Sequence, residues 1–151
     1  MEIRAYREED EVAVAALWRQ AFAYTPPWNA PEEDIQRKLA VQPELFFVAE
    51  LDGQVVGTAM AGYDGHRGWV YYVAVSPNHR RQGIGTALMR RVEQALAAIG
   101  CPKLNLQVRA GGHEAVAFYR RLGYDVEQRV SMSKRLTGPW PQRDGQDGRH
   151  V

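Results

Sequence analysis

The alternation of apolar and polar residues predicts one strand and two helices in the N-terminal third of the chain. Residues 2–6 alternate with the period of a strand, and an acidic run at residues 8–10 precedes an apolar helical face that continues to about residue 23. Three prolines before residue 32 end this helix, because proline lacks the backbone donor and fixes φ. A second helix is expected over residues 32–41.

The middle of the chain has the pattern of an antiparallel sheet. Residues 45–51 and 54–63 are apolar segments separated by Asp52-Gly53, a dipeptide typical of two-residue hairpin turns. A second turn, rich in glycine, leads into another apolar segment at residues 69–75. We therefore expect three consecutive antiparallel strands, and the last of them is expected to be central.

Helices and strands alternate in the C-terminal half. Apolar residues at helical spacing run from residue 84 to Gly100, and a glycine also ends a second helix expected over residues 114–122. Strands are expected at residues 103–108 and, with a weak break, at residues 124–135. This order of elements is typical of a mixed α/β domain whose sheet is covered by helices.

Composition and charge narrow the class of protein. A chain of 151 residues suits one domain, residues 1–136, followed by a flexible polar tail, residues 137–151. The formal net charge of +1 favours neither nucleic acid nor a membrane surface as partner, and no apolar run is long enough to cross a bilayer. Cys101 is the single cysteine, and the histidines lack metal-ligand spacing. We expect a soluble, cytoplasmic protein without a metal site.

A glycine-containing turn follows the segment at residues 69–75. Gly83 and Gly85 stand where this strand gives way to a helix, and Arg80 and Arg81 precede them. Small residues let backbone amides approach an anionic ligand, and the helix N-terminus adds partial positive charge. The turn predicts a pyrophosphate site, although a strand-to-helix turn that binds nothing often contains one glycine as well.

Two common nucleotide sites do not fit this turn. A nucleoside triphosphatase loop requires Gly-Lys-Ser/Thr, whereas Thr86 follows Gly85 directly. A dinucleotide-binding loop requires a third glycine, and Leu88 occupies that position. The ligand is therefore expected to be an anion of another kind.

Two segments together resemble one enzyme family. Residues 80–85 match the signature Arg/Gln-x-x-Gly-x-Gly/Ala, and residues 115–124 are similar to a closing helix of the form A-x-x-x-Y-x-x-x-G-F/Y. With the preceding V-A-V-S-P strand, the chain resembles the GCN5-related N-acetyltransferase (GNAT) family over residues 3–136. The resemblance implies an α/β fold with a mixed, mostly antiparallel central sheet, helices on both faces, and strands that splay apart at the cofactor site.

The resemblance implies that the turn binds acetyl-coenzyme A. Backbone amides from Arg81 to Thr86 would hold the pyrophosphate, and main-chain groups of the preceding strand would pair with the pantetheine arm. An amide of that strand, from Val73 or Ala74, would polarise the thioester carbonyl. The cofactor-binding residues implied in this way are Val73, Ala74, Val75, Arg80, Arg81, Gln82, Gly83, Ile84, Gly85 and Thr86.

Tyr119 matches the family tyrosine that protonates the leaving thiolate of coenzyme A. A phenol with a reference pKa of about 10 keeps its proton at neutral pH and can donate it to the sulfur. An aromatic residue at this helical position also suits packing on the core, as we expect of its neighbour Phe118.

The sequence does not assign the general base. The segment around Gln107 resembles a strand of the ribosomal-protein N-terminal acetyltransferases, which carry a glutamate there as the base, and glutamine cannot accept the proton. Gly112 also stands where the family often has an asparagine that contacts the cofactor. The other candidates, each explained as well by a hairpin, a turn or the core, are Glu50, Asp64, His66 and Tyr72, or a water chain ending at one of them.

The acceptor is expected to bind between the first two helices and near the turn after residue 63. Trp28 and Asn29 lie in a proline-flanked segment that suits a rigid aromatic lid or, as readily, a hydrophobic staple for the next helix. These features resemble the bacterial acetyltransferase subgroup typified by the YpeA protein. The acceptor-site candidates are Trp28, Asn29, Asp64, His66 and Tyr72.

These patterns predict an acetyl-coenzyme A-dependent N-acetyltransferase that acts by direct attack of a primary amine in a ternary complex. The acceptor would be a small-molecule amine or a peptide amine, and transfer to a protein N-terminus or lysine differs only in that acceptor. For a second class, an acyl-coenzyme A-binding sensor without turnover, Gln107 and the lack of an assigned base speak in favour, whereas Tyr119 speaks against it. Nothing in the sequence sets the oligomeric state, and a homodimer is left open.

Overall fold

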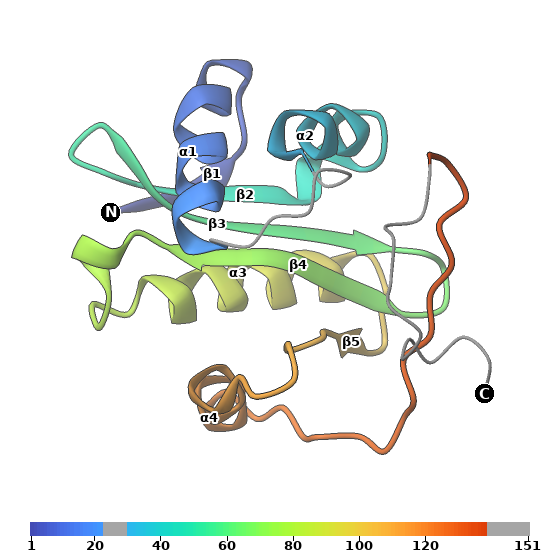
Figure 1. Cartoon of the computed structure of the whole chain (residues 1–151). Coiled ribbons are helices and arrows are strands. Elements are labelled where there is room, and N and C mark those ends of the chain that lie inside the picture. Colours follow the sequence, from blue (N-terminus) through green and yellow to red (C-terminus); the bar gives the residue numbers. More distant parts are fainter. Residues whose placement is uncertain (23–29, 139–151) are drawn as a thin grey trace, which may run out of the picture.

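The computed structural model describes residues 1–22 and 30–138 and contains one five-stranded sheet (Figure 1). The strands follow one another across the sheet in chain order. The first four pair antiparallel and the fifth pairs parallel with the fourth, so the expected mixed, mostly antiparallel sheet is confirmed. The strands are β1 (Glu2–Ala5), β2 (Phe46–Leu51), β3 (Gln54–Tyr63), β4 (Gly68–Val75) and β5 (Leu104–Asn105).

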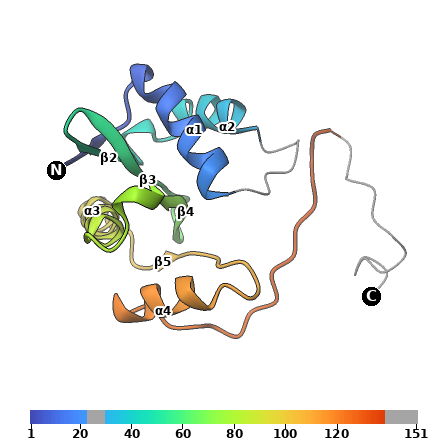
Figure 2. The ribbon, with the colours of Figure 1, turned by 60° about the vertical axis from the view of Figure 1, so that its left-hand side comes forward.

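Helices cover both faces of the sheet, as the family resemblance implied. Two helices, α1 and α2, lie on one face, whereas α3 lies on the other and α4 lies beyond β5 on that same side (Figures 1 and 2). The chain therefore forms three layers, with the sheet as the middle one. The helices are α1 (Glu11–Ala21), α2 (Pro31–Leu39), α3 (Ile84–Ala98) and α4 (His113–Arg121).

A separate apolar core fills the space on each side of the sheet. Alternate strand residues point to opposite faces, so Phe46 packs with Trp18 of α1 and Ile35 of α2, whereas Phe47 packs with the α3 core that includes Leu88. All five side chains are buried. The apolar residues whose spacing predicted these elements are thus the residues that form the two cores.

Local chemistry sets several element boundaries. Asp52 and Gly53 have φ values of 51° and 75°, which form the left-handed two-residue turn that the dipeptide predicted. The acidic run at residues 8–10 forms a short 3-10 turn of its own, so α1 begins only at Glu11. Pro31 is the first residue of α2, where its missing donor costs nothing.

The predicted strands near the C-terminus are wrong in part. Only Leu104 and Asn105 of residues 103–108 pair as a strand, because the chain then leaves β4 and heads for α4. Residues 124–135 form no strand in the described part of the chain, although their pattern alternates. Their backbone lacks a neighbouring strand to pair with, and Val130 is 89% exposed.

Part of the predicted domain organisation falls on residues 139–151, which lie outside the described residues, and the boundary at residue 136 stays a prediction. Within residues 1–22 and 30–138, we find no helix with the length and apolar character needed to cross a bilayer.

Candidate active site

The sheet opens between β4 and β5. The two strands pair only at Gly68↔Leu104 and Trp69↔Asn105, whereas β4 continues to Val75 with β3 as its sole partner strand among the described residues. Main-chain groups of the later β4 residues on this side therefore have no neighbouring strand (Figure 2). The predicted splaying of strands is confirmed at Val73, Ala74 and Val75.

A bulge bends β4 where the sheet opens. Thr58 of β3 lies opposite Ala74 and Met60 lies opposite Tyr71, so one residue of β3 faces two residues of β4. Tyr72, one of those two, has a φ of 53°, a conformation that a bulky residue rarely adopts. Bulges increase the twist of a strand and change the direction of its side chains. This bulge lies where β4 diverges from β5.

Thr58 holds the bulge in place. Its side chain is fully buried, accepts a hydrogen bond from Trp18 Nε1 at 2.9 Å and donates one to the Tyr72 carbonyl at 2.8 Å. The indole of Trp18 also stacks on the Tyr72 ring, with the centroids 3.7 Å apart. No motif pointed to Thr58, and its only sequence signal is a hydroxyl within an apolar strand.

We expect Thr58→Val to destabilise the protein by about 2–3 kcal/mol and to lower turnover. Valine keeps the shape but leaves the buried indole donor of Trp18 and the half-buried carbonyl of Tyr72 without their partner. Denaturant unfolding and steady-state rates measure the two effects, and Thr58→Ser, which keeps the hydroxyl, should restore both. If valine and serine behave alike, the hydroxyl does not hold the bulge.

The glycine turn presents its backbone amides. Gly83 has a φ of 79° and Arg81 a φ of 63°, and the first backbone hydrogen bond of α3 runs from the Ala87 amide to the Gly83 carbonyl at 3.0 Å. The backbone amides of residues 81–86 donate no hydrogen bond within the described chain. Arg80 and Arg81 are exposed beside them. The turn has the donors and the charge of an anion site.

The glycine turn and the closing helix meet in space. A Cβ on Gly85 would lie 3.2 Å from the ring of Phe118 in α4, so this glycine permits close packing of α3 against α4. Phe118 and Tyr119 pack on the same core as Val73 and Val75 of β4. Two motifs that are thirty residues apart in the sequence thus border the same opening of the sheet.

Tyr119 is a protonated phenol with no described hydrogen-bond partner. Its ring makes edge contacts with Phe118 and Tyr124, at centroid distances of 5.0 and 5.9 Å. Burial raises the pKa of Tyr119 to about 12, so the group holds its proton throughout the neutral range. It is therefore available as a proton donor.

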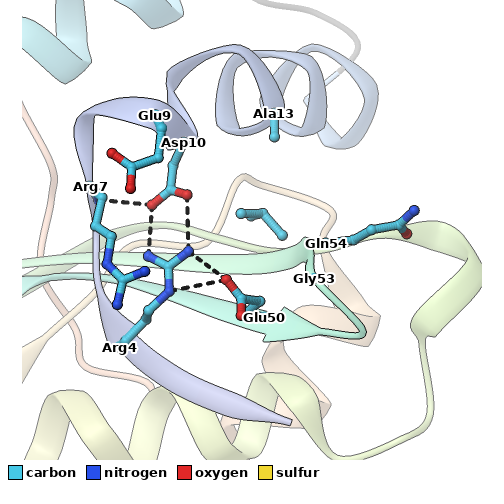
Figure 3. Close-up of a pocket in the computed structure, with 9 residues that line it drawn as sticks. Arg4, Arg7, Glu9, Asp10, Ala13, Glu50, Gly53 and Gln54 are labelled. Atoms are coloured by element: carbon cyan, nitrogen blue, oxygen red, sulfur yellow. Dashed lines mark hydrogen bonds and ion pairs between the residues drawn. The ribbon is translucent and has the colours of Figure 1, made fainter.

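Two of the four predicted general bases, Asp64 and Glu50, are held by other groups. Asp64 accepts the amides of His66 and Arg67 at 2.8 Å each, and these backbone bonds hold the pKa of Asp64 below its usual value. The turn explanation of Asp64 and His66 therefore describes the structure. Glu50 is engaged by Arg4, at 2.8 Å from Nη2 (Figure 3).

Tyr72 is bound as well and gains a partner that the sequence analysis missed. Its hydroxyl donates to Asp34 Oδ2 on α2, and burial followed by this hydrogen bond raises the pKa of Tyr72. Asp34 also pairs with Arg37, at 2.7 Å. A charged helix surface was the only sequence signal for Asp34, whereas the structure ties it to β4. Trp28 and Asn29 lie outside the described residues.

The two departures from the family pattern have local explanations. Gln107 Nε2 donates to Ser131 Oγ at 2.6 Å, an amide interaction that needs no carboxylate. A Cβ on Gly112 would lie 2.8 Å from Val108 Cγ1 and 3.0 Å from the Arg109 carbonyl, so an asparagine does not fit there. No described group of histidine, cysteine or acidic residues could hold a metal ion.

Sequence comparison places this site in a family. The sequence profile of the acetyltransferase (GNAT) family matches residues 12–124. An acetyltransferase of Pectobacterium atrosepticum is 46% identical over 136 residues, which cover 90% of this chain and 96% of that one. An acetyltransferase of Sodalis glossinidius is 47% identical over 137 residues, with the same coverage. The chain belongs to the GNAT family, and its enzyme class is N-acetyltransferase.

Solved structures share the fold. The aminoglycoside 6'-N-acetyltransferase of Acinetobacter haemolyticus superimposes with a TM-score of 0.74 at 21% identity, covering 91% of this chain and all of that one. The ribosomal-protein-S18-alanine N-acetyltransferase of Escherichia coli gives 0.69 at 26% identity, with 81% and 76% covered. Another aminoglycoside N-acetyltransferase, crystallised with CoA, gives 0.74 at 20% identity, with 90% and 95% covered. The likeness to the YpeA subgroup stays a prediction.

Proposed function

We propose that the protein transfers an acetyl group from acetyl-coenzyme A to a primary amine by direct attack in a ternary complex. The observation that carries this proposal is the meeting of the glycine turn with α4 at the opening between β4 and β5. Free backbone amides beside two arginines, a strand edge with no partner among the described residues, and a protonated phenol occur there together. Each is needed for one step of acyl transfer from a thioester.

The donor site would be built largely from backbone. Acetyl-coenzyme A supplies a thioester whose carbonyl carbon is open to attack by an amine. Free amides of residues 81–86 would hold its pyrophosphate, and Arg80 and Arg81 would add charge. The open edge of β4 would pair with the pantetheine arm as an added strand does, and an amide of Val73 or Ala74 would polarise the thioester carbonyl.

Tyr119 would donate its proton to the departing sulfur. The acceptor must first become a neutral amine, and removing a proton from an amine of pKa about 10.4 at neutral pH costs roughly 4–5 kcal/mol. Asp64 and Glu50 are committed to other partners, which favours a water chain or an acceptor whose amine has a lower pKa. An α-amine at a peptide N-terminus meets that requirement.

An acyl-coenzyme A sensor without turnover is the second candidate. Gln107 in place of a carboxylate, together with the bound state of Asp64 and Glu50, favours it. The hydroxyl of Tyr119, which has no hydrogen-bond partner among residues 1–22 and 30–138, favours the enzyme, since a sensor does not need a proton donor at the opening.

Thiol release at steady state distinguishes the two candidates. The protein, acetyl-coenzyme A and a panel of small amines and N-terminal peptides are mixed, and free thiol and acetylated acceptor are measured. We expect release that depends on the acceptor, with an equal amount of acetylated product. Tight binding of coenzyme A by calorimetry without turnover on any acceptor would instead support the sensor. The double variant Arg80→Ala/Arg81→Ala should weaken coenzyme A binding in either case.

A further inference from the structure

Trp69 and Tyr71 of β4 are two aromatic side chains that belong to neither apolar core of the described chain. Val70 between them packs on the α3 core, so both lie on the face of the sheet that carries α1 and α2. Their neighbours on β3 are Gly62 and Met60. The two rings, here called the aromatic pair, are nearly parallel, with planes 10° apart and centroids 6.3 Å apart. Two large rings thus stand side by side on the sheet without a core to bury them.

The aromatic pair borders the opening between β4 and β5. Trp69 forms the last residue pair of the two strands, with Asn105, and Tyr71 lies two residues further, where β4 has left β5. Tyr71 directly precedes the bulge and is 48% exposed. It also stands two residues before Val73, one of the two residues whose amide would polarise the thioester carbonyl. The aromatic pair therefore follows β4 up to the place proposed for the reacting carbonyl.

The groups proposed to act on the donor lie on the other face of the sheet. Gly85 at the start of α3 packs against Phe118 of α4, and Tyr119 packs on the core beneath α3. The cofactor and the proton donor to its sulfur would therefore occupy the α3 face. An amine that attacks the thioester needs a separate approach, and the face with the aromatic pair provides it.

Three charged side chains near the aromatic pair already have partners. Asp34 is held by two side chains and Asp64 by two amides of its own turn. Lys38 Nζ donates to the Ala61 carbonyl at 2.5 Å. What the pair itself offers an acceptor is two ring faces and the hydroxyl of Tyr71, which donates to no other residue of the described chain.

We propose that the aromatic pair binds the part of the acceptor next to the reacting nitrogen, and that the acceptor is a primary amine carried close to an aromatic or similarly flat apolar group. This assignment of the acceptor class rests on the acetyl transfer proposed above. A ring of the acceptor would stack on the aromatic pair or meet it edge to face. A small arylalkylamine and a peptide that begins with an aromatic residue share this chemistry. A polyamine lacks the ring and would meet carboxylates that are already engaged.

Acceptor preference is the first test. Thiol release is measured with 3-phenylpropylamine, n-propylamine and spermidine, and with two peptides that begin with phenylalanine and with alanine. We expect kcat/KM to be about tenfold higher for the acceptor with the ring in at least one matched pair. A preference confined to the peptides would assign the source to a polypeptide, and one confined to the free amines would assign it to a small molecule.

Variants of the aromatic pair test whether these rings cause the preference. Tyr71→Leu keeps apolar bulk without a ring, and Trp69→Leu does the same at the other position, so each should bring the ratio of kcat/KM values close to one. Comparison with the wild type cancels any difference in basicity between the two amines. Val12→Leu, which changes an α1 residue that is 82% exposed, should keep the ratio. Calorimetry with coenzyme A checks that each variant is folded. A preference that survives both leucine variants overturns the inference.

Binding without turnover separates this inference from the proposed function. Calorimetry measures the affinity of 3-phenylpropylamine and of the phenylalanine peptide for the protein saturated with coenzyme A. Binding that weakens about tenfold in Tyr71→Leu, without thiol release, would support the acceptor site and contradict the proposed enzyme. Thiol release that is equal for both members of each pair, or fastest with spermidine, would overturn the acceptor class and leave the proposed enzyme standing. A complex that binds neither aromatic probe overturns the inference.

Discussion

Replacing Tyr119 with phenylalanine is expected to lower kcat by about a hundredfold or more while coenzyme A binding changes little. The change removes only the hydroxyl, which donates to no described residue, so the packing with Phe118 and Tyr124 is kept. The proposed proton donor to the leaving sulfur is lost with it. Steady-state kinetics and calorimetry with coenzyme A measure the two quantities separately.

Tyr6 provides a matched control for this change. Its ring stacks on Phe46 in the other core, at a centroid distance of 4.6 Å, and burial raises its pKa to about 12 as well. Tyr6→Phe should therefore leave kcat unchanged. An unchanged kcat in Tyr119→Phe would remove this tyrosine from the mechanism and leave the family assignment intact.

The pH dependence adds a second measurement. With a pKa raised to about 12, Tyr119 keeps its proton at pH 7 through 10 or so, and kcat should not fall over that interval from loss of this group. A basic limb near pH 8 would mean that another group carries the proton.

The sequence predicted most of the fold because its strongest signals are local. Asp52-Gly53 fixed the hairpin between β2 and β3, since both residues must adopt positive φ. Glycines ended α3 and α4 close to the expected positions. The turn at Gly83 was also recognisable, because glycine lets the backbone adopt a positive φ and approach a ligand closely.

Features that depend on distant contacts could not be predicted. The bulge at Tyr72 has no local signature, because it is held by Thr58 on the neighbouring strand and by Trp18 from α1. Asp34 looked like part of a charged helix surface until the fold brought Tyr72 to it. Residues 124–135 show the same limit. Their alternation predicts a strand, but a strand forms only where another strand pairs with it, and alternation does not say whether one lies beside them.

The same limit applies to the candidate site. Sequence motifs predicted the glycine turn and Tyr119. Only the structure shows that the two motifs meet, through the contact of Gly85 with Phe118. The candidates for the base were chosen by residue type alone. Asp64 is held by the amides of its own turn, as the turn explanation predicted, whereas the partner of Glu50 in an ion-pair cluster is Arg4, 46 residues away in the sequence, and could not be predicted.

That ion-pair cluster is expected to dominate the stability of the N-terminal part of the sheet. Arg4 donates to both oxygens of Asp10, at 2.8 and 3.0 Å, and to Glu50, while Asp10 also accepts the Arg7 amide (Figure 3). Arg4 is 9% exposed and Asp10 is 5% exposed. A carboxylate this deeply buried depends on its partner for its charge.

Arg4→Met should lower the free energy of unfolding by about 3 kcal/mol or more, because it leaves the Asp10 carboxylate buried without its cation. Urea or guanidinium unfolding at pH 7 measures the loss. Arg19→Met breaks an exposed ion pair with Glu32 and should change stability little. A double variant, Arg4→Met/Asp10→Leu, should recover much of the loss, since it removes the stranded charge with its partner.

The loss in Arg4→Met should shrink as the pH falls. In the wild-type protein burial alone would raise the pKa of Asp10, but hydrogen bonds from Arg4 and the Arg7 amide overcome it and hold the pKa below its usual value. Asp10 thus stabilises the fold above about pH 3.9, and this contribution is lost as the pH falls through the lower folded-state pKa. Without Arg4, burial raises the pKa of Asp10, so the variant binds a proton on folding and gains stability on acidification. A difference in unfolding free energy that stays constant from pH 7 to pH 4 would show that the lost packing of Arg4, and not the stranded charge, causes the effect.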